Sequence, residues 1–330
     1  MDMRKFKIII AVIFLGGLTI PSRGQQLPLY TQYFMNRFLV NPALSGSDGY
    51  TSVNLTAREQ WIGVPGSPST QALSFQTRLL KRSYISKSTS VRRRMRHPSR
   101  GGRVGLGGYL FNDRNGIIRR NGFQLTYAYH IPMRTSQLSF GLSVNAFQMK
   151  IDPQDIYVPL DPGDTYLQNY DFTVFIPDAN FGVYYMTRDY YVGFSAMQLF
   201  NSSIKLSKTG NNGYQLNRHY YIIGGYRFDI NYDLSLRPTI MAKSFDNLHT
   251  FQTTITATLY YKDNYWAGLS YRTNDAISIL GGIKYQNYYF GYSFDYTLNR
   301  LQRFSFGSHE FIFAAKFGDN ARRYRWLNRY

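Results

Sequence analysis

Hydrophobic residues recur at every second position in many segments of this 330-residue chain. In 123–131, Phe, Leu, Tyr and Ile alternate with Gln, Thr, Ala and His, and the segments 251–261 and 311–317 show the same period. A side-chain period of two predicts β-strands with one apolar and one polar face. A soluble β-sandwich has the same alternation, so other features have to distinguish the two folds.

Strand length favours a barrel that crosses a membrane. Most of the expected strands are long enough for the roughly 9–11 residues that cross a bilayer, rather than the about five or six of a typical soluble strand. They are 50–58, 69–79, 103–112, 122–131, 137–149, 178–187, 190–198, 218–229, 233–244, 251–261, 265–271, 276–286, 288–296 and 310–317. We therefore predict an all-β fold, a transmembrane antiparallel up-and-down β-barrel of about 14 strands.

The aromatic composition supports the membrane barrel. The chain has 30 Tyr, 24 Phe and 3 Trp, and aromatic residues cluster near strand ends, as at 260–261, 265–266 and 288–290. Girdles at the two membrane interfaces would place one end of each ring in apolar surroundings and the other end in water. A sandwich core would instead have to bury many Tyr hydroxyls with partners.

The N-terminus has the composition of a secretory signal peptide. Basic residues within 1–7 precede an apolar run at 8–20, which at about 13 residues is shorter than the roughly 20 that span a bilayer. We predict cleavage near Gly24-Gln25, with an uncleaved anchor as the alternative. The expected parts are a signal peptide at 1–24, a periplasmic or lumenal N-terminal segment at 25–49, an outer-membrane barrel at 50–317 and a basic C-terminal tail at 318–330.

The formal net charge of +19 at pH 7 by itself suggests nucleic acid or an acidic surface as a partner. An exported membrane barrel does not meet nucleic acid, so we expect membrane lipid and proteins instead. The chain has no Cys, which excludes disulfides, thiolate metal sites and a cysteine nucleophile.

Charge also differs between the two sides of the predicted barrel. With the N-terminus in the periplasm, even-numbered connections are periplasmic; the later ones are tight turns, and the odd-numbered ones include long stretches. The even-numbered connection 79–103 and the tail are basic, whereas 150–178 is acidic. Candidate residues for docking a periplasmic partner are Arg92, Arg93, Arg94, Arg96, Arg322, Arg323 and Arg325. Binding to anionic headgroups and a solvated loop remain alternatives.

Short motifs follow one another along nearly the whole mature chain, beginning with Thr31-Gln32-Tyr33-Phe34-Met35-Asn36 and ending with Gly307-Ser308-His309-Glu310. The ordered series resembles the PorP/SprF family of the type IX secretion system, found in gliding and protein-secreting Bacteroidota. The residues that carry the resemblance are Gln32, Tyr33, Asn36, Asn41, Pro42, Gly46, Gln60, Trp61, Gly63, Asn112, Asp113, Pro177, Asp178, Gly307, Ser308, His309 and Glu310. The Arg-rich connection and the basic tail depart from the family pattern.

The resemblance implies a non-enzymatic outer-membrane barrel that works with the type IX machinery. Family members support secretion or surface attachment of adhesins and other proteins with C-terminal sorting signals. The implied partners are periplasmic and outer-membrane components of the system and a secreted surface adhesin. The alternative is a passive porin-like channel, which requires an open lumen.

Local chemistry suggests roles for two motifs. Pro42 restricts Asn41 to extended conformations, and 45–49 is typical of a turn, so 25–49 is either an ordered segment tucked into or under the barrel or a flexible lead-in. The Gly- and Pro-rich loop that follows Trp61 is stiff. It either folds over the lumen or places Trp61 in a girdle.

Motifs for catalysis or for cofactor and metal binding are absent from the sequence. The five His have no metal-ligand spacing, and there is no nucleophile elbow or phosphate-binding loop. An outer-membrane hydrolase would therefore lack a nucleophile and an acid pair. The acids at 161–164 lack the spacing of a calcium loop. His130 has the parity of the lumen, where we expect a hydrogen-bonded residue rather than a base.

Overall fold

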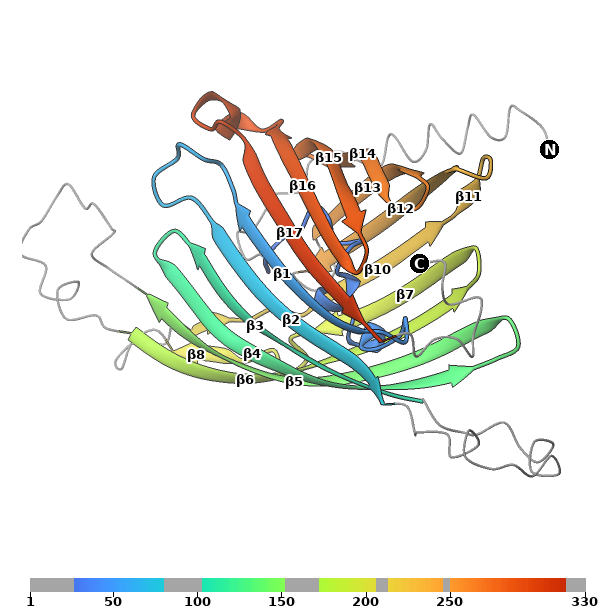
Figure 1. Ribbon diagram of the computed structural model, residues 1–330. Coiled ribbons are helices and arrows are strands. Elements are labelled where there is room, and N and C mark those ends of the chain that lie inside the picture. The colour runs from blue at the N-terminus through green and yellow to red at the C-terminus, as the bar shows by residue number, and fades with distance from the viewer. Residues whose placement is uncertain (1–26, 80–102, 152–171, 206–212, 246–249, 319–330) are drawn as a thin grey trace, which may run out of the picture.

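The computed structural model describes residues 27–79, 103–151, 172–205, 213–245 and 250–318 (Figure 1). The signal peptide, the acids at 161–164 and the candidate docking residues Arg92, Arg93, Arg94, Arg96, Arg322, Arg323 and Arg325 lie outside these ranges. Among the described residues, no helix is both long enough and apolar enough to cross a membrane.

Fourteen antiparallel strands form a closed barrel, as predicted. They are β1 (Thr51–Glu59), β2 (Ser69–Leu79), β3 (Val104–Asn115), β4 (Ile118–Pro132), β5 (Ser136–Ile151), β6 (Phe172–Thr187), β7 (Tyr190–Met197), β10 (His219–Tyr226) with its continuation β11 (Phe228–Asp229), β12 (Leu234–Phe245), β13 (Thr250–Tyr261), β14 (Tyr265–Arg272), β15 (Ala276–Tyr285), β16 (Tyr288–Thr297) and β17 (Ser308–Phe317). Each strand pairs with its neighbours along the chain, and β1 pairs with β17 to close the cylinder. We call the two mouths the β1–β2 end and the β2–β3 end, after the connections they carry.

Two features of the wall differ from the sequence prediction. The expected connection at 113–121 is an extension of the β3–β4 hairpin, which turns at Gly116 with φ +59°. The strand β6 likewise begins at Phe172 instead of 178. Outward-facing residues of the β3–β4 extension are polar, so the alternation that marks a lipid-facing strand stops before the strand does. The connection from β7 to β10 also contains an unexpected small hairpin of β8 (Ser203–Lys205) and β9 (Gly213–Gln215).

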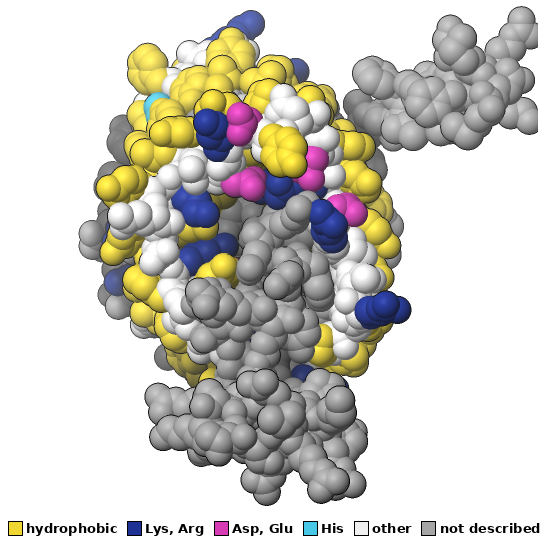
Figure 2. All heavy atoms as spheres, turned by 45° about the vertical axis from the view of Figure 1, so that its right-hand side comes forward, with side chains coloured by type: hydrophobic (Ala, Val, Ile, Leu, Met, Phe, Trp, Pro, Cys, Tyr) yellow, Lys and Arg dark blue, Asp and Glu magenta, His cyan; other side chains and the backbone are white. Residues whose placement is uncertain are grey.

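The two faces of the wall are chemically opposite. In β1 the inward residues Ser52, Asn54, Thr56 and Arg58 are buried, whereas the outward Leu55 is 46% exposed. The period of two places apolar side chains toward lipid and polar side chains toward the lumen, as in outer-membrane barrels. Figure 2, which turns the right-hand side of Figure 1 forward, shows hydrophobic side chains on the rim and charged side chains gathered inside it.

Aromatic residues at the strand ends divide between the two faces. Tyr265, Tyr285 and Tyr271 point outward and are exposed, as expected for interfacial girdles. The Trp266 side chain is instead 4% exposed and stacks on Tyr260 inside the barrel, with ring centroids 6.0 Å apart. Only every second member of the aromatic clusters can therefore belong to a girdle.

Candidate functional site

The lumen is occupied by the N-terminal part of the chain, residues 27–49, which we call the lumenal segment (Figure 1). It contains two short 3-10 helices, η1 (Arg37–Leu39) and η2 (Pro42–Leu44). The Asn41 side chain caps η2 by accepting a hydrogen bond from the Ala43 amide at 2.9 Å, and Pro42 occupies the first helical position.

The lumenal segment runs along the barrel from the β1–β2 end to the β2–β3 end. Its first described residue, Leu27, accepts a hydrogen bond from the Lys243 ammonium at 3.3 Å near the end of β12. Its penultimate residue, Asp48, pairs with Lys316 at 3.2 Å near the opposite end of the barrel. The chain then enters β1 from the β2–β3 end, so the segment traverses the lumen once before the first strand begins.

Glycines on the inner wall make room for this segment. A Cβ atom on Gly105 would lie 1.9 Å from the Ser45 carbonyl oxygen, and one on Gly141 would lie 2.2 Å from the Ala43 amide nitrogen. A Cβ atom on Gly182 would lie 2.1 Å from the Asn41 side-chain oxygen. At Gly105 and Gly141 backbone therefore packs directly on backbone, and at Gly182 the Asn41 side chain does so, which only glycine allows.

A buried charged cluster fixes the segment near the β1–β2 end. The Arg58 guanidinium of β1 lies 2.6 Å from Asp295 of β16 and 3.1 Å from Glu310 of β17. The Thr31 hydroxyl donates to Asp295 at 2.7 Å and accepts from Arg58 at 2.7 Å and from Arg272 at 2.9 Å. One donor and two acceptor sites are the full capacity of a hydroxyl, so Thr31 is completely bonded.

Glu310 joins the same cluster to the backbone of the segment. One carboxylate oxygen accepts from the Thr31 amide at 2.7 Å, and the other accepts from the Gln32 amide at 2.8 Å. Arg58, Asp295, Glu310 and Thr31 are each at most 1% exposed. Buried charges are tolerated when opposite charges compensate them, and here Asp295 and Glu310 both face the Arg58 guanidinium.

The middle of the segment bonds to opposite sides of the wall. The Tyr33 hydroxyl lies 2.9 Å from the Thr239 hydroxyl in β12, and the side-chain amide of Asn36 donates to the Ser74 hydroxyl in β2 at 3.0 Å. The side-chain amide of Asn41 donates to the backbone carbonyl oxygens of Val183 and Phe194, at 3.1 and 3.2 Å. These contacts hold the segment across the full width of the lumen.

The final turn of the segment is bonded near the β2–β3 end. The His130 ring nitrogen Nε2 lies 2.9 Å from the Ser45 carbonyl oxygen, and its Nδ1 lies 2.8 Å from the Ser139 hydroxyl. Gln137 and Arg78 both donate to the Ser47 carbonyl oxygen at 3.3 Å. The prediction that His130 is a hydrogen-bonded lumenal residue is confirmed.

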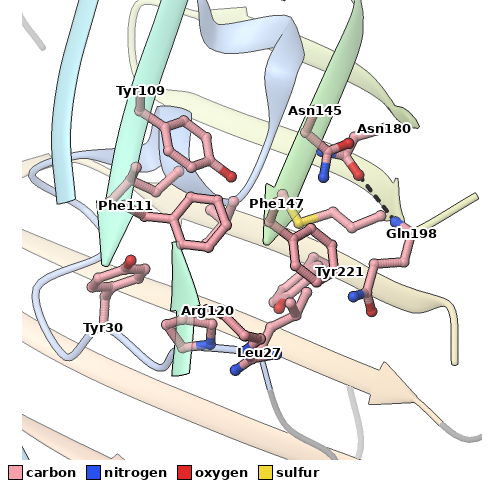
Figure 3. A pocket seen from close by; sticks show the side chains of 14 residues that line it. Leu27, Tyr30, Tyr109, Phe111, Arg120, Asn145, Phe147, Asn180, Gln198 and Tyr221 are labelled. Atoms are coloured by element: carbon pink, nitrogen blue, oxygen red, sulfur yellow. Dashed lines mark hydrogen bonds between the residues drawn. The ribbon is translucent and has the colours of Figure 1, made fainter. Parts of the chain in front are cut away.

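A cavity remains between the segment and the wall, toward the β1–β2 end (Figure 3). Its lining is mostly apolar, and Tyr30 of the segment faces Phe111 and Phe147 of the wall across it. Asn180 lies on one side of the cavity, and its side-chain oxygen accepts a hydrogen bond from the backbone amide of Gln198 at 3.0 Å. Within the described parts of the chain, no three His, Asp or Glu side chains are grouped so that they could hold a metal ion.

The residues of the family resemblance fall into separate groups. Gln32, Tyr33, Asn36, Asn41, Pro42 and Gly46 belong to the lumenal segment, and Glu310 binds its backbone. Asp113 forms an ion pair with Arg120 in the β3–β4 hairpin and accepts from the Thr70 hydroxyl at 2.7 Å. In β6, Pro177 faces outward, and the buried Asp178 accepts the Phe200 amide at 3.1 Å.

Most of the remaining resemblance residues lie where the β1–β2 loop meets the β16–β17 loop, at the β1–β2 end. The Trp61 amide donates to the Ser308 hydroxyl at 3.1 Å, and the Ile62 amide donates to the Gly307 carbonyl oxygen at 2.9 Å. Gly63 and Gly307 have φ values of +99° and +94°, which favour glycine. Gln60 and His309 flank these contacts, and Asn112 lies on the outer face of β3. The β1–β2 loop, which contains Trp61, thus packs against the β16–β17 loop.

Sequence reasoning missed the cations of the charged cluster, Arg58 and Arg272, and their partner Asp295. Each lies in a strand at a position of lumen parity. A charged residue at such a position inside a membrane strand has to find an opposite charge within the lumen. That signal was available, but it does not identify which charges meet.

Comparison with known proteins gives a family and a set of similar shapes. The family model described as "Type IX secretion system membrane protein PorP/SprF" matches residues 22–314. No curated protein matches the chain.

Solved structures of similar shape include the Ralstonia pickettii toluene transporter TbuX, with a TM-score of 0.47 and 11% identity over 89% of this chain and 95% of that chain. The P. putida toluene transporter TodX has a TM-score of 0.45 and 10% identity over 84% and 92%. These likenesses carry no argument about function. The family match covers most of the sequence, and the chain belongs to the PorP/SprF family of type IX secretion system membrane proteins.

Proposed function

We propose that this protein is a plugged outer-membrane barrel that serves type IX secretion by docking other proteins at its two ends, and does not conduct solutes. The observation that carries the proposal is the lumenal segment, bonded to the wall from Leu27 to Asp48. A passive channel requires an open lumen, whereas a component that docks other proteins requires a rigid barrel.

The proposal includes an orientation and a set of partners. We place the β2–β3 end in the periplasm, because the basic connection 79–103 and the basic tail both extend from it in the sequence. Periplasmic components of the type IX system bind at this end, through Arg92, Arg93, Arg94 and the other basic residues of the two segments. The protein supports secretion or surface attachment of proteins such as adhesins with C-terminal sorting signals.

A genetic experiment tests the role in secretion. A strain that lacks the gene is complemented with the wild type or with a variant in which the arginines at 92–94 and 96 are replaced by Gln. We expect the deletion to abolish surface display of sorting-signal proteins, the wild type to restore it, and the variant to lose co-purification of periplasmic type IX components. Normal display in the deletion strain would overturn the proposal.

Planar-bilayer recording tests the alternative of a passive channel. We expect the purified wild type to show almost no conductance, and a variant lacking 27–48 to conduct, because its lumen is no longer filled. A matched control is Arg134→Gln, which changes an exposed charge on a β2–β3-end turn and leaves the lumen intact. Substantial conductance by the wild type, equal to that of the deletion variant, would favour the channel.

A further inference from the structure

A polar hollow lies on the outside of the barrel at the β1–β2 end, away from the lumen. Its lining includes Ser69, Gln71, Asn112, Arg114, Arg119 and Asn121. The β1–β2 loop closes one side, because the Gly116 amide of the β3–β4 turn donates to the Gly66 carbonyl oxygen at 3.0 Å. None of these side chains belongs to the cluster that fixes the lumenal segment.

The hollow begins where the apolar belt of the barrel ends. In β4 the outward side chains are Leu125 and Phe123, which are 64% and 42% exposed, and then Asn121 and Arg119. The neighbouring β3 passes from Leu110 to Asn112 and Arg114 on the same face. Residues two apart share one face of a strand, so the polar positions lie directly beyond the hydrocarbon region, at the level of lipid headgroups.

Three cations stand side by side on this outer face. Arg114 lies directly opposite Arg119 across the β3–β4 pair, and Arg119 lies directly opposite Lys150 across the β4–β5 pair. Like charges directly opposite one another destabilise a sheet, so an anion held between them would relieve the repulsion. Each cation also has an interaction of its own, but a guanidinium carries five donors and can bind more than one acceptor.

The chemistry of the hollow fits a phosphorylated headgroup. Planar guanidinium groups bind phosphate oxygens in pairs, and the amides of Asn112, Asn121 and Gln71 can bond hydroxyl groups beside the phosphate. Glu59 borders the hollow, and its carboxylate accepts from the Ser69 hydroxyl at 2.5 Å. That negative charge disfavours an anion at the Ser69 edge and places it between Arg114 and Arg119.

We propose that this hollow binds the phosphate of an anionic membrane lipid whose acyl chains lie along the apolar face of β3 and β4. The lipid faces Leu110, Phe123 and Leu125 with its chains and Arg114 and Arg119 with its headgroup. In the orientation proposed above, this lipid belongs to the outer leaflet. The inference does not depend on a role in type IX secretion.

Native mass spectrometry of the purified full-length protein in detergent, titrated with lipid A, tests the inference. We expect lipid A to bind the wild type, and Arg114→Gln with Arg119→Gln to weaken binding by about tenfold or more, because charge-assisted hydrogen bonds are lost. The matched control is Arg134→Gln with Arg188→Gln, two exposed arginines at the β2–β3 end. This control should bind lipid A as the wild type does.

Two further arms identify the source of the anion. Phosphate-free lipid A should bind as weakly to the wild type as lipid A does to the double variant. Inorganic phosphate at millimolar concentration should not displace bound lipid A. Unchanged binding by the double variant, equal binding of the phosphate-free lipid, or complete displacement by inorganic phosphate would each overturn the inference. If the double variant does not fold, Arg119→Gln alone should still weaken binding measurably, and unchanged binding would count against the inference.

Discussion

The inner and outer faces of the barrel wall are built from the same strands, yet they depend on different properties of their residues. On the outer face, Leu125 and Leu110 are more than half exposed and need only be apolar, because lipid chains adapt to any apolar shape. On the inner face, Gly141 and Arg58 each contact one particular part of the lumenal segment. The outer face is therefore set by hydropathy and the inner face by individual contacts.

This difference shows where the specific information of the molecule lies. Replacing one apolar residue with another on the outer face keeps an apolar side chain in contact with lipid. A change inside leaves a buried charge unpaired or forces two backbones apart. Substitutions should therefore be tolerated outside the barrel whenever they stay apolar, and inside only when they keep shape and charge.

The largest effect should follow from Arg58→Met. Asp295 and Glu310 would lose their common cation while remaining buried, which costs about 3–5 kcal/mol of unfolding free energy. Urea unfolding in detergent micelles measures this loss. If Arg58→Met were as stable as the wild type, the charged cluster would not be what holds the lumenal segment.

The next largest effect should come from placing a charge on the outer face. Leu125→Arg puts a guanidinium at a lipid-facing position that is 64% exposed, which costs about 2–4 kcal/mol near the bilayer midplane and less toward the interface. Leu125→Phe is the control and should change stability little. The measurement is folding equilibrium in lipid vesicles, and equal stability of the two variants would refute the lipid-facing assignment.

Glycine substitutions compare the two faces directly. Gly141→Ala would place a Cβ atom 2.2 Å from the Ala43 amide nitrogen and should lose about 1–3 kcal/mol by overpacking. Gly224→Ala has its nearest neighbour, an Ile240 methyl, at 3.6 Å and should be close to neutral. Thermal unfolding of the two variants in the same detergent makes the comparison. A larger loss for Gly224→Ala would reverse the proposed difference between the faces.

The smallest effect should come from an ion pair outside the lumen. Asp229 pairs with Arg227 at 2.6 Å at the β2–β3 end, and the carboxylate is 46% exposed. Exposed pairs contribute about 0.2–1 kcal/mol, so Asp229→Asn should change urea unfolding by no more than that. A loss comparable with that of Arg58→Met would mean that burial is not what distinguishes the two pairs.

The wall of the barrel was predictable because lipid imposes one rule on all of its strands. Alternation located all fourteen strands, and parity alone placed His130 in the lumen. Alternation failed in the β3–β4 extension, where Arg114 and Arg119 leave the apolar belt while the strands continue. Hydrogen bonding between the strands does not require a lipid-facing side chain, so the hairpin continues beyond the last residues that show the apolar–polar alternation.

The contacts of the lumenal segment could not be predicted in the same way. Thr31 and Glu310 are 279 positions apart, and a polar pair inside a lumen leaves no periodic trace in the sequence. The resemblance pointed to Gln32, Asn36 and Asn41 without saying what they touch. Gly141 and Gly182 look like ordinary strand glycines until the segment is in place, because their role is to leave space for the backbone and side chains of residues 41–43.

The charged cluster also spans the seam at which the cylinder closes. Arg58 and Glu310 lie on β1 and β17, the first and last strands, which are joined by nine register pairs. Lateral opening of the wall at this seam, toward the bilayer, would have to separate these two charges as well as the ladder between the strands. It would also part the Thr31 amide from Glu310 or the Thr31 hydroxyl from Arg58. The lumenal segment thus helps to hold the first and last strands together, and it opposes lateral opening of the barrel toward the membrane.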